Sequence, residues 1–232
     1  MVIILLIIAC LALFASAMFI KQRGVRIVAV LVSVILLVGS TTLMVLNYHS
    51  HFGMKKVTMT TTKMVVPVAK QLPIALYQPL GTDGKEEVLL YRNSPTGKVQ
   101  HTKADENITS KMKFANVQSP TMTVKKTRWQ FKNNFYKTLF MWSGMDGTLA
   151  KQQTTITYPQ EFVKVTPRQM RKMKSAMAAS ATSQAAQRQA LAAAVATELA
   201  KHPQASAQQR QAIAQRVQWQ LTSQMIKRAL AQ

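Results

Sequence analysis

The chain has 232 residues, a formal net charge of +22 at pH 7 and a single cysteine, Cys10. The length is typical of one or two domains, and one cysteine excludes both a disulfide framework and a cysteine-based zinc site. So large a positive charge attracts polyanions such as anionic lipid, wall polymers, nucleic acid or an acidic protein, although surface charge also serves plain solubility.

The first 46 residues are almost wholly apolar and contain three charged side chains, Lys21, Arg23 and Arg26. Val2–Ile20 and Ile27–Leu46 are uncharged, and a helix of about 20 residues spans the ~30 Å hydrocarbon core of a bilayer. The sequence therefore predicts a two-helix transmembrane anchor over residues 1–46. Small residues at possible helix contacts would let the two backbones approach each other. In the alternative, small residues are simply common in such helices. The residues concerned are Ala12, Ser16, Ser33, Gly39 and Ser40.

The three basic residues between the spans predict the orientation of the anchor. Loops rich in Lys and Arg stay in the cytoplasm, so the turn is expected inside and the soluble domain outside. Lys55, Lys56 and Lys63 follow the second span and argue for the opposite orientation. The aromatic pattern of Tyr48, His49 and Phe52 is typical of an interfacial belt on the domain side. We expect a cell-membrane protein with two spans and an extracytoplasmic domain.

Residues 47–56 are expected to form a juxtamembrane linker, and residues 57–165 a β-rich domain. Short β-branched or apolar runs alternate there with turn signals such as 81–85 and 93–97. The expected strands are Thr58–Ala69, Leu72–Gln78, Glu87–Arg92, Lys98–Lys103, Ile108–Phe114, Thr121–Phe131, Phe135–Trp142 and Thr154–Tyr158. This series predicts a small antiparallel β sandwich or barrel, so that the soluble part is of the α+β class.

Residues 166–232 contain 18 Ala and 13 Gln, both good helix formers. Thr166 and Ser206 are suitable N-caps. They predict a C-terminal αα-hairpin made of helices Arg168–Lys201 and Ala207–Ala231. The two helices can pack on each other, dock on another protein, or be partly disordered alone.

The sequence contains no recognisable catalytic pattern. The eight acidic residues are scattered, and there is no phosphate-binding glycine loop, nucleophile elbow or His-Glu-x-x-His motif. His49 and His51 could form half of a metal site but have no evident third ligand. We expect neither an enzyme nor a cofactor or metal ion.

One candidate anion-binding site is the basic and aromatic segment formed by Lys125, Lys126, Arg128 and Lys132 around Trp129 and Phe131. Interleaved aromatic and basic side chains bind sugars, lipid headgroups or nucleic acid. In the alternative, Trp129 and Phe131 belong to the core and the cations protect a sheet edge.

A second candidate consists of Arg168, Arg171, Lys172 and Lys174 in the first two turns of the predicted helix. Cations are disfavoured there because the helix dipole is already positive, so an external anion would be stabilising. The alternative interpretation is ordinary surface charge.

Three stretches of the sequence resemble those of a known protein family: Lys21–Arg26, Leu80–Glu86 with the following Val88–Tyr91, and Tyr158–Pro167. With the order of the parts, they resemble an uncharacterised family of two-span membrane proteins of lactic acid bacteria, a domain of unknown function, over about residues 1–175. The Ala/Gln-rich tail departs from it. The resemblance implies a membrane protein but no particular activity.

These observations favour a membrane-anchored, basic, extracytoplasmic interaction module of a Gram-positive cell envelope. Its ligands would be membrane lipid together with anionic wall polymers or another membrane protein. One alternative is an accessory subunit of a membrane transporter or envelope complex. Another is a cytoplasmic-facing binder of anionic lipid or nucleic acid, which requires the reverse orientation; nucleic acid is the less favoured ligand.

Overall fold

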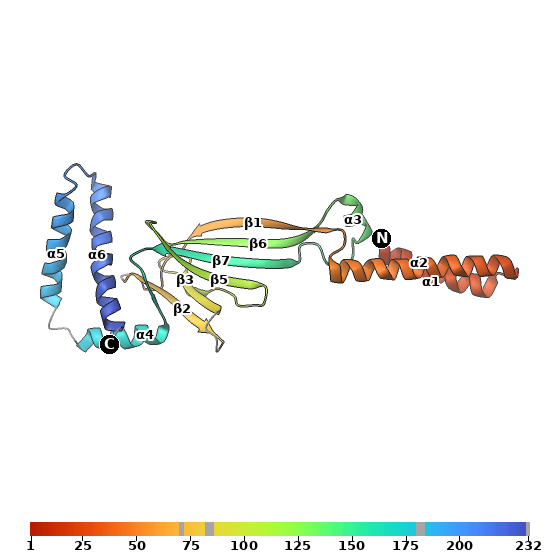
Figure 1. Cartoon of the computed structure of the whole chain (residues 1–232), viewed down its shortest axis with the longest axis horizontal. Coiled ribbons are helices and arrows are strands. Elements are labelled where there is room, and N and C mark those ends of the chain that lie inside the picture. The colour runs from red at the N-terminus through yellow and green to blue at the C-terminus, as the bar shows by residue number, and fades with distance from the viewer. Residues whose placement is uncertain (70–71, 82–85, 180–183, 231–232) are drawn as a thin grey trace. The chain divides into compact units, whose positions relative to one another are not determined.

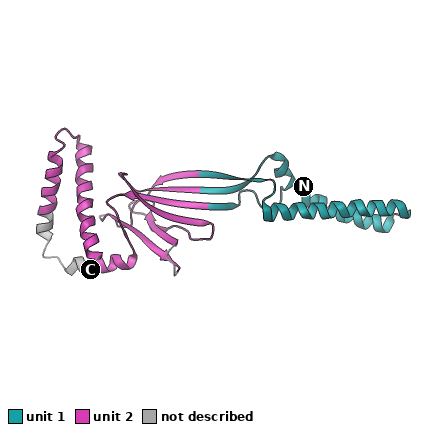
Figure 2. Ribbon diagram, in the orientation of Figure 1, with its two compact units in different colours: residues 1–59, 126–151 teal, residues 60–125, 152–232 magenta. Residues whose placement is uncertain are grey.

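The computed structural model describes residues 1–69, 72–81, 86–179 and 184–230, and the side chains of Lys174 and of 176–188 lie outside that description (Figure 1). The expected order of parts is confirmed: two apolar helices, a domain with two sheets, and C-terminal helices. The chain divides into two compact units (Figure 2), unit 1 of residues 1–59 and 126–151 and unit 2 of residues 60–125 and 152–232. Strands β1, β6 and β7 contribute residues to both units.

Helices α1 (Val2–Phe19) and α2 (Arg23–Ser50) form an apolar hairpin in unit 1, and both are long and apolar enough to span a membrane. The buried residues recur every seven positions, as Val2, Ala9 and Ser16 in α1 and Ser33, Ser40 and Asn47 in α2. A seven-residue spacing returns to the same face every two turns, so these residues form the seam between the helices. The expected close approach at Ser16, Ser33 and Ser40 is therefore seen, whereas Gly39 is exposed.

The expected linker over 47–56 is replaced by ordered structure. Helix α2 continues past Leu46 to Ser50, and strand β1 (Met54–Met64) begins four residues later. The helix ends because His51 and Gly53 adopt left-handed backbone angles, with φ of 52° and 79°. The amides of His51 and Phe52 then both donate to the Leu46 carbonyl, Phe52 at 3.1 Å, so this carbonyl at the end of the helix has partners.

Within the described residues, eight strands form two open four-stranded sheets, one in the order β1-β6-β7-β5 and the other β4-β3-β2-β8. The remaining strands are β2 (Ile74–Leu80), β3 (Glu86–Arg92), β4 (Val99–His101), β5 (Ile108–Ala115), β6 (Thr121–Phe131), β7 (Leu149–Pro159) and β8 (Val163–Val165). The expected all-antiparallel arrangement is wrong in two places, because β2 pairs with β8 and β5 pairs with β7 in parallel. The fold is a sandwich-like pair of mixed sheets.

One expected strand is a helix. Phe135–Trp142 has an apolar, aromatic composition that favours a strand, but helix α3 (Asn134–Leu139) occupies this segment. The Asn133 side chain caps it by accepting a hydrogen bond from the Tyr136 amide at 3.1 Å. Of the expected turn at 81–85, residues 82–85 lie outside the described residues.

Each unit has its own buried core. Unit 2 contains Leu89, Met122, Ile156 and Tyr158 with other side chains from both sheets, and unit 1 contains Phe131 with side chains from the hairpin and α3. Burial raises the pKa of the Tyr158 phenol, whose hydroxyl oxygen has no hydrogen-bond partner in the part of the chain that the structure describes.

The Ala/Gln-rich tail forms helices α4 (Pro167–Ala179), α5 (Gln184–Ala200) and α6 (Ala207–Leu230), and residues 180–183 of the expected first helix lie outside the described residues. Both expected N-caps are present, because the amides of Gln169 and Gln209 donate to the hydroxyls of Thr166 and Ser206. Helices α5 and α6 contact each other. Ile226 of α6 also packs into a core of unit 2, so the tail folds partly on its own domain.

Candidate functional site: a lysine and threonine face of the sheet

Strand β5, which pairs with β7, places two lysines on the side of the sheet that faces away from the core. Met112 pairs with Ile156 in parallel register, and both pack in the core of unit 2. Neighbouring side chains on a strand point to opposite faces. Lys111 and Lys113 therefore point away from the core, and both are exposed.

Strand β6 adds a third lysine to this side. Met122 is buried in the same core and Val124 packs against it, so Thr123 and Lys125 point outward. Lys125 is exposed, and the Thr123 hydroxyl lies 3.2 Å from that of Thr62 on β1. We call this surface the outer face; it consists of Thr62, Thr109, Lys111, Lys113, Thr123, Lys125, Thr155 and Thr157.

The outer face combines cations with hydroxyls and carries no carboxylate among these residues. Several acids of unit 2 already have cationic partners: Glu87 pairs with Lys164, Glu161 with Arg216, and Glu198 with Lys201. The hydrogen bond from Lys201 also lowers the pKa of the Glu198 carboxyl. Ammonium groups donate only, whereas hydroxyls donate and accept. A polyanion with both oxyanions and hydroxyls matches this set of groups.

The spacing of the lysines suits a repeating ligand. Positions two apart on one strand are separated by about 7 Å, as Lys111 and Lys113 are. Strand β7 lies between β5 and β6, so Lys125 stands about two strand spacings, or roughly 10 Å, from the β5 row.

The other cations of the first sequence-predicted cluster lie in unit 1. Lys126 and Arg128 alternate with Lys125 and so belong to the opposite face of β6. Arg128 donates to the Gly147 carbonyl at 2.6 Å, while Lys132 is exposed. Phe131 is buried, and Trp129 is half-buried between the His51 ring, stacked at 4.0 Å, and the Lys56 ammonium at 4.9 Å.

The second predicted cluster lies on α4. Arg168, Arg171 and Lys172 are exposed, and the side chain of Lys174 lies outside the described residues. The Thr166 hydroxyl already accepts from the Gln169 amide at 3.2 Å, and Gln169 accepts in return from the Thr166 amide. This capping box satisfies donors that an anion would otherwise use.

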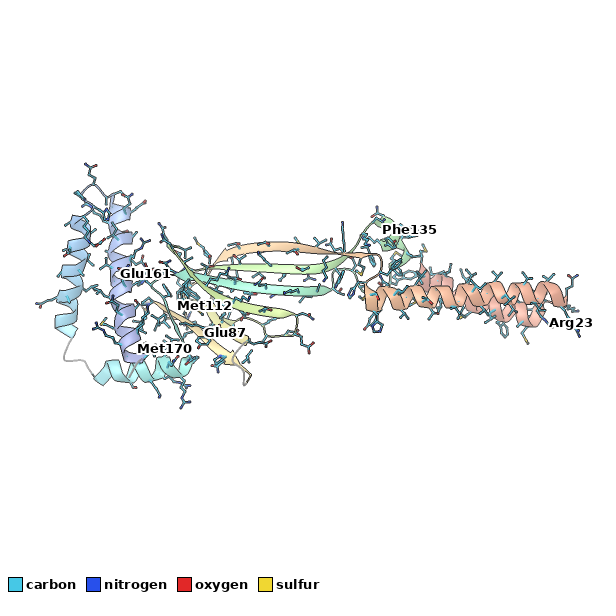
Figure 3. The ribbon with its side chains drawn as sticks, in the orientation of Figure 1. Arg23, Glu87, Met112, Phe135, Glu161 and Met170 are labelled. Carbon is cyan, nitrogen blue, oxygen red and sulfur yellow. The ribbon has the colours of Figure 1, made fainter. Side chains whose placement is uncertain are left out.

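The basic residues of the hairpin turn are at its end away from α3, where Figure 3 labels Arg23. The turn is shorter than expected, because Arg23 and Arg26 lie in the first turn of α2. Lys21, Arg23 and Arg26 are all exposed. Cations at a helix N-terminus oppose its dipole, so anionic groups nearby would be stabilising.

At its other end the hairpin meets α3, labelled in Figure 3 by Phe135. Large aromatic side chains remain exposed there, among them Tyr48 (68%), Phe135 (66%) and Trp142 (57%). We call these residues, with nearby exposed lysines, the collar; it consists of Tyr48, Phe52, Lys55, Lys132, Phe135, Lys137 and Trp142. The sequence indicated Tyr48 and Phe52, but not Phe135 and Trp142, because their segment was expected to be a strand.

A wide groove of about 760 Å³ lies in unit 2 beside the α5–α6 turn. Arg216 lies 3.6 Å from Glu161 and donates to the Asn116 side-chain oxygen at 3.2 Å, so its charge already has partners. Within the described part of the chain, no three His, Cys, Asp or Glu residues converge as metal ligands. The outer face is therefore the stronger candidate site.

Comparison with known proteins adds a family. The model of a domain of unknown function, DUF4811, matches residues 22–173, which extend from the start of α2 into α4. No curated protein and no solved structure gives a match. The match covers more than half of the chain, and the chain belongs to the family of the domain of unknown function DUF4811.

Proposed function

We propose that the protein is a membrane-anchored interaction module that holds an anionic envelope polymer on its outer face. The observation that carries this proposal is the placement of Lys111, Lys113 and Lys125 on one side of the sheet with threonine hydroxyls, without a carboxylate among the residues that define the outer face. A polymer of phosphates and hydroxyl-bearing units would use both kinds of group.

The hairpin supplies the anchor in this proposal. Its exposed apolar side chains would face lipid, and the collar would lie at the headgroup level, where aromatic and basic side chains concentrate. The cations at Lys21, Arg23 and Arg26 favour a cytoplasmic turn and an extracytoplasmic domain. The resemblance to two-span proteins of lactic acid bacteria supports a Gram-positive envelope as the setting.

Binding would depend on several weak contacts at once. An exposed ion pair contributes less than about 1 kcal/mol and is screened by salt. Three lysines on one face, reinforced by the net charge of +22, can hold a polymer that presents many anions. The affinity should therefore decrease steeply as salt concentration rises.

The test replaces the three lysines together. The full chain carrying Lys111→Gln, Lys113→Gln and Lys125→Gln, in an uncharged detergent, is titrated with a synthetic poly(glycerol phosphate) oligomer. We expect the dissociation constant to rise about tenfold, on the order of 0.5 kcal/mol for each lost pair, with a weaker dependence on salt.

The matched control removes the same charge from exposed lysines off the outer face, by Lys98→Gln, Lys103→Gln and Lys227→Gln. This control should bind nearly as the unchanged chain does. Equal loss in both triple variants would mean that net charge alone attracts the polymer, and the proposed face would be rejected.

A further inference from the structure

A small, partly open slot lies in unit 1, where the ends of the hairpin meet the segment after α3. Its volume is about 170 Å³, and its lining includes Val2, Met44, Asn47, Phe140, Trp142 and Ser143. At ~30 Å³ per water molecule it has room for roughly five or six waters, which is enough for a three-carbon headgroup fragment.

Asn47, one of the residues that line the slot, is a buried polar residue with an unused hydrogen-bonding atom. Asn47 is 1% exposed, and its amide nitrogen donates to the Phe52 carbonyl at 2.9 Å. That bond fixes the orientation of the Asn47 amide, because a flipped amide would place its side-chain oxygen against the Phe52 carbonyl oxygen, and both atoms are acceptors. The side-chain oxygen is buried and has no hydrogen-bond partner among the described residues, which is costly unless a donor reaches it from the slot.

The charges of unit 1 restrict the kind of donor. This unit has ten Lys and Arg residues and one acidic residue, Asp146. A lipid ammonium group would be repelled by this excess of positive charge. A neutral hydroxyl donates to an amide oxygen without that penalty.

The surroundings restrict the molecule that carries the hydroxyl. The exposed apolar surface of α1 and α2 adjoins the slot, and the exposed collar residues Tyr48 and Trp142 line it. A glycerolipid could place its headgroup in the slot while its acyl chains lie along the hairpin. We propose that the slot binds a glycerolipid through a free headgroup hydroxyl that donates to the Asn47 oxygen; this inference rests on the proposed insertion of the hairpin in a membrane.

The experiment compares two probes that differ in one donor. The full chain is placed in phosphatidylcholine nanodiscs with brominated 1,2-dioleoylglycerol or with its 3-O-methyl ether, and quenching of tryptophan fluorescence is followed. The Trp142→Phe variant supplies the background from the other tryptophans. We expect the brominated dioleoylglycerol to reach half-maximal quenching at a mole fraction about five- to tenfold lower than its methyl ether does. This ratio corresponds to the free energy that one buried hydrogen bond contributes to binding.

A pair of variants ties the preference to Asn47. Asn47→Leu should remove the difference between the two lipids, whereas the same change at exposed Asn134 should retain it. Equal quenching of the unchanged chain by both lipids would overturn the inference, and so would a preference that survives in Asn47→Leu. If brominated phosphatidylcholine also fails to quench, the hairpin is not in the bilayer, and both the slot and the proposed anchor are rejected.

Discussion

Replacing Gly53 by alanine is expected to lower the free energy of unfolding of unit 1 by about 2–5 kcal/mol. Gly53 has a φ of 79°, and a left-handed angle costs an L-residue about 1–2 kcal/mol. A Cβ atom there would also stand 2.5 Å from the nearest ring carbon of Tyr136. Tyr136 packs in the core of unit 1, so relieving the overlap adds about 1–3 kcal/mol.

The control for this substitution is Gly147→Ala, in the same unit. Gly147 has a nearly identical φ of 77°, but a Cβ atom there would meet nothing within 4 Å. Thermal unfolding followed by tryptophan fluorescence should show a clearly smaller shift for Gly147→Ala. Equal shifts would mean that the packing of Tyr136 against residue 53 is not as described.

The second large effect concerns Tyr158 at alkaline pH. Burial raises the pKa of its phenol, whereas in the unfolded chain a tyrosine titrates near pH 10. Above about pH 10 the unfolded state loses this proton and the folded state retains it. The stability is therefore intact below pH 10 and falls by about 1.4 kcal/mol per pH unit as pH rises towards the folded pKa.

The variant that isolates this effect is Tyr158→Phe. The Tyr158 hydroxyl oxygen is buried and finds no partner within the described residues, so removing it should not destabilise the protein at neutral pH. Denaturant unfolding of both proteins from pH 7 to 11.5 should give curves that separate above pH 10, with the phenylalanine variant the more stable. Parallel curves would show that the phenol ionises without unfolding.

The sequence predicted the features that local chemistry determines. Apolar runs located both hairpin helices, alternation gave the bounds of β6, and Thr166 and Ser206 marked two helix starts. The strand prediction for Phe135–Trp142 was wrong because the cap formed by the Asn133 side chain favours helix α3, although the aromatic composition of the segment favours a strand. The sequence also failed at the parallel pairing of β5 with β7, since hydrophobic alternation contains no information about the partner strand.

The candidate site was predicted only in part for the same reason. Lys125 was identified from its basic segment, but Lys111 and Lys113 were not. Their alternation with Ile108, Ser110 and Met112 could have placed both on one face of β5. Their relation to Lys125 depends on β7 lying between the two strands, which only the sheet order gives. The slot likewise depends on tertiary structure that brings the segment after α3 to Asn47.

The most direct test of the account is the membrane topology of the full chain. Single cysteines replace exposed Ser94 or exposed Gln22 in a Cys10→Ala background, and intact cells are treated with a membrane-impermeant maleimide. Because the proposed domain lies outside the cell, we expect Ser94→Cys to be labelled before lysis and Gln22→Cys only after it. The reverse pattern would contradict this orientation, placing the outer face in the cytoplasm with inner-leaflet lipid or nucleic acid as its ligand. Labelling of both positions on intact cells would show that the hairpin does not span the membrane.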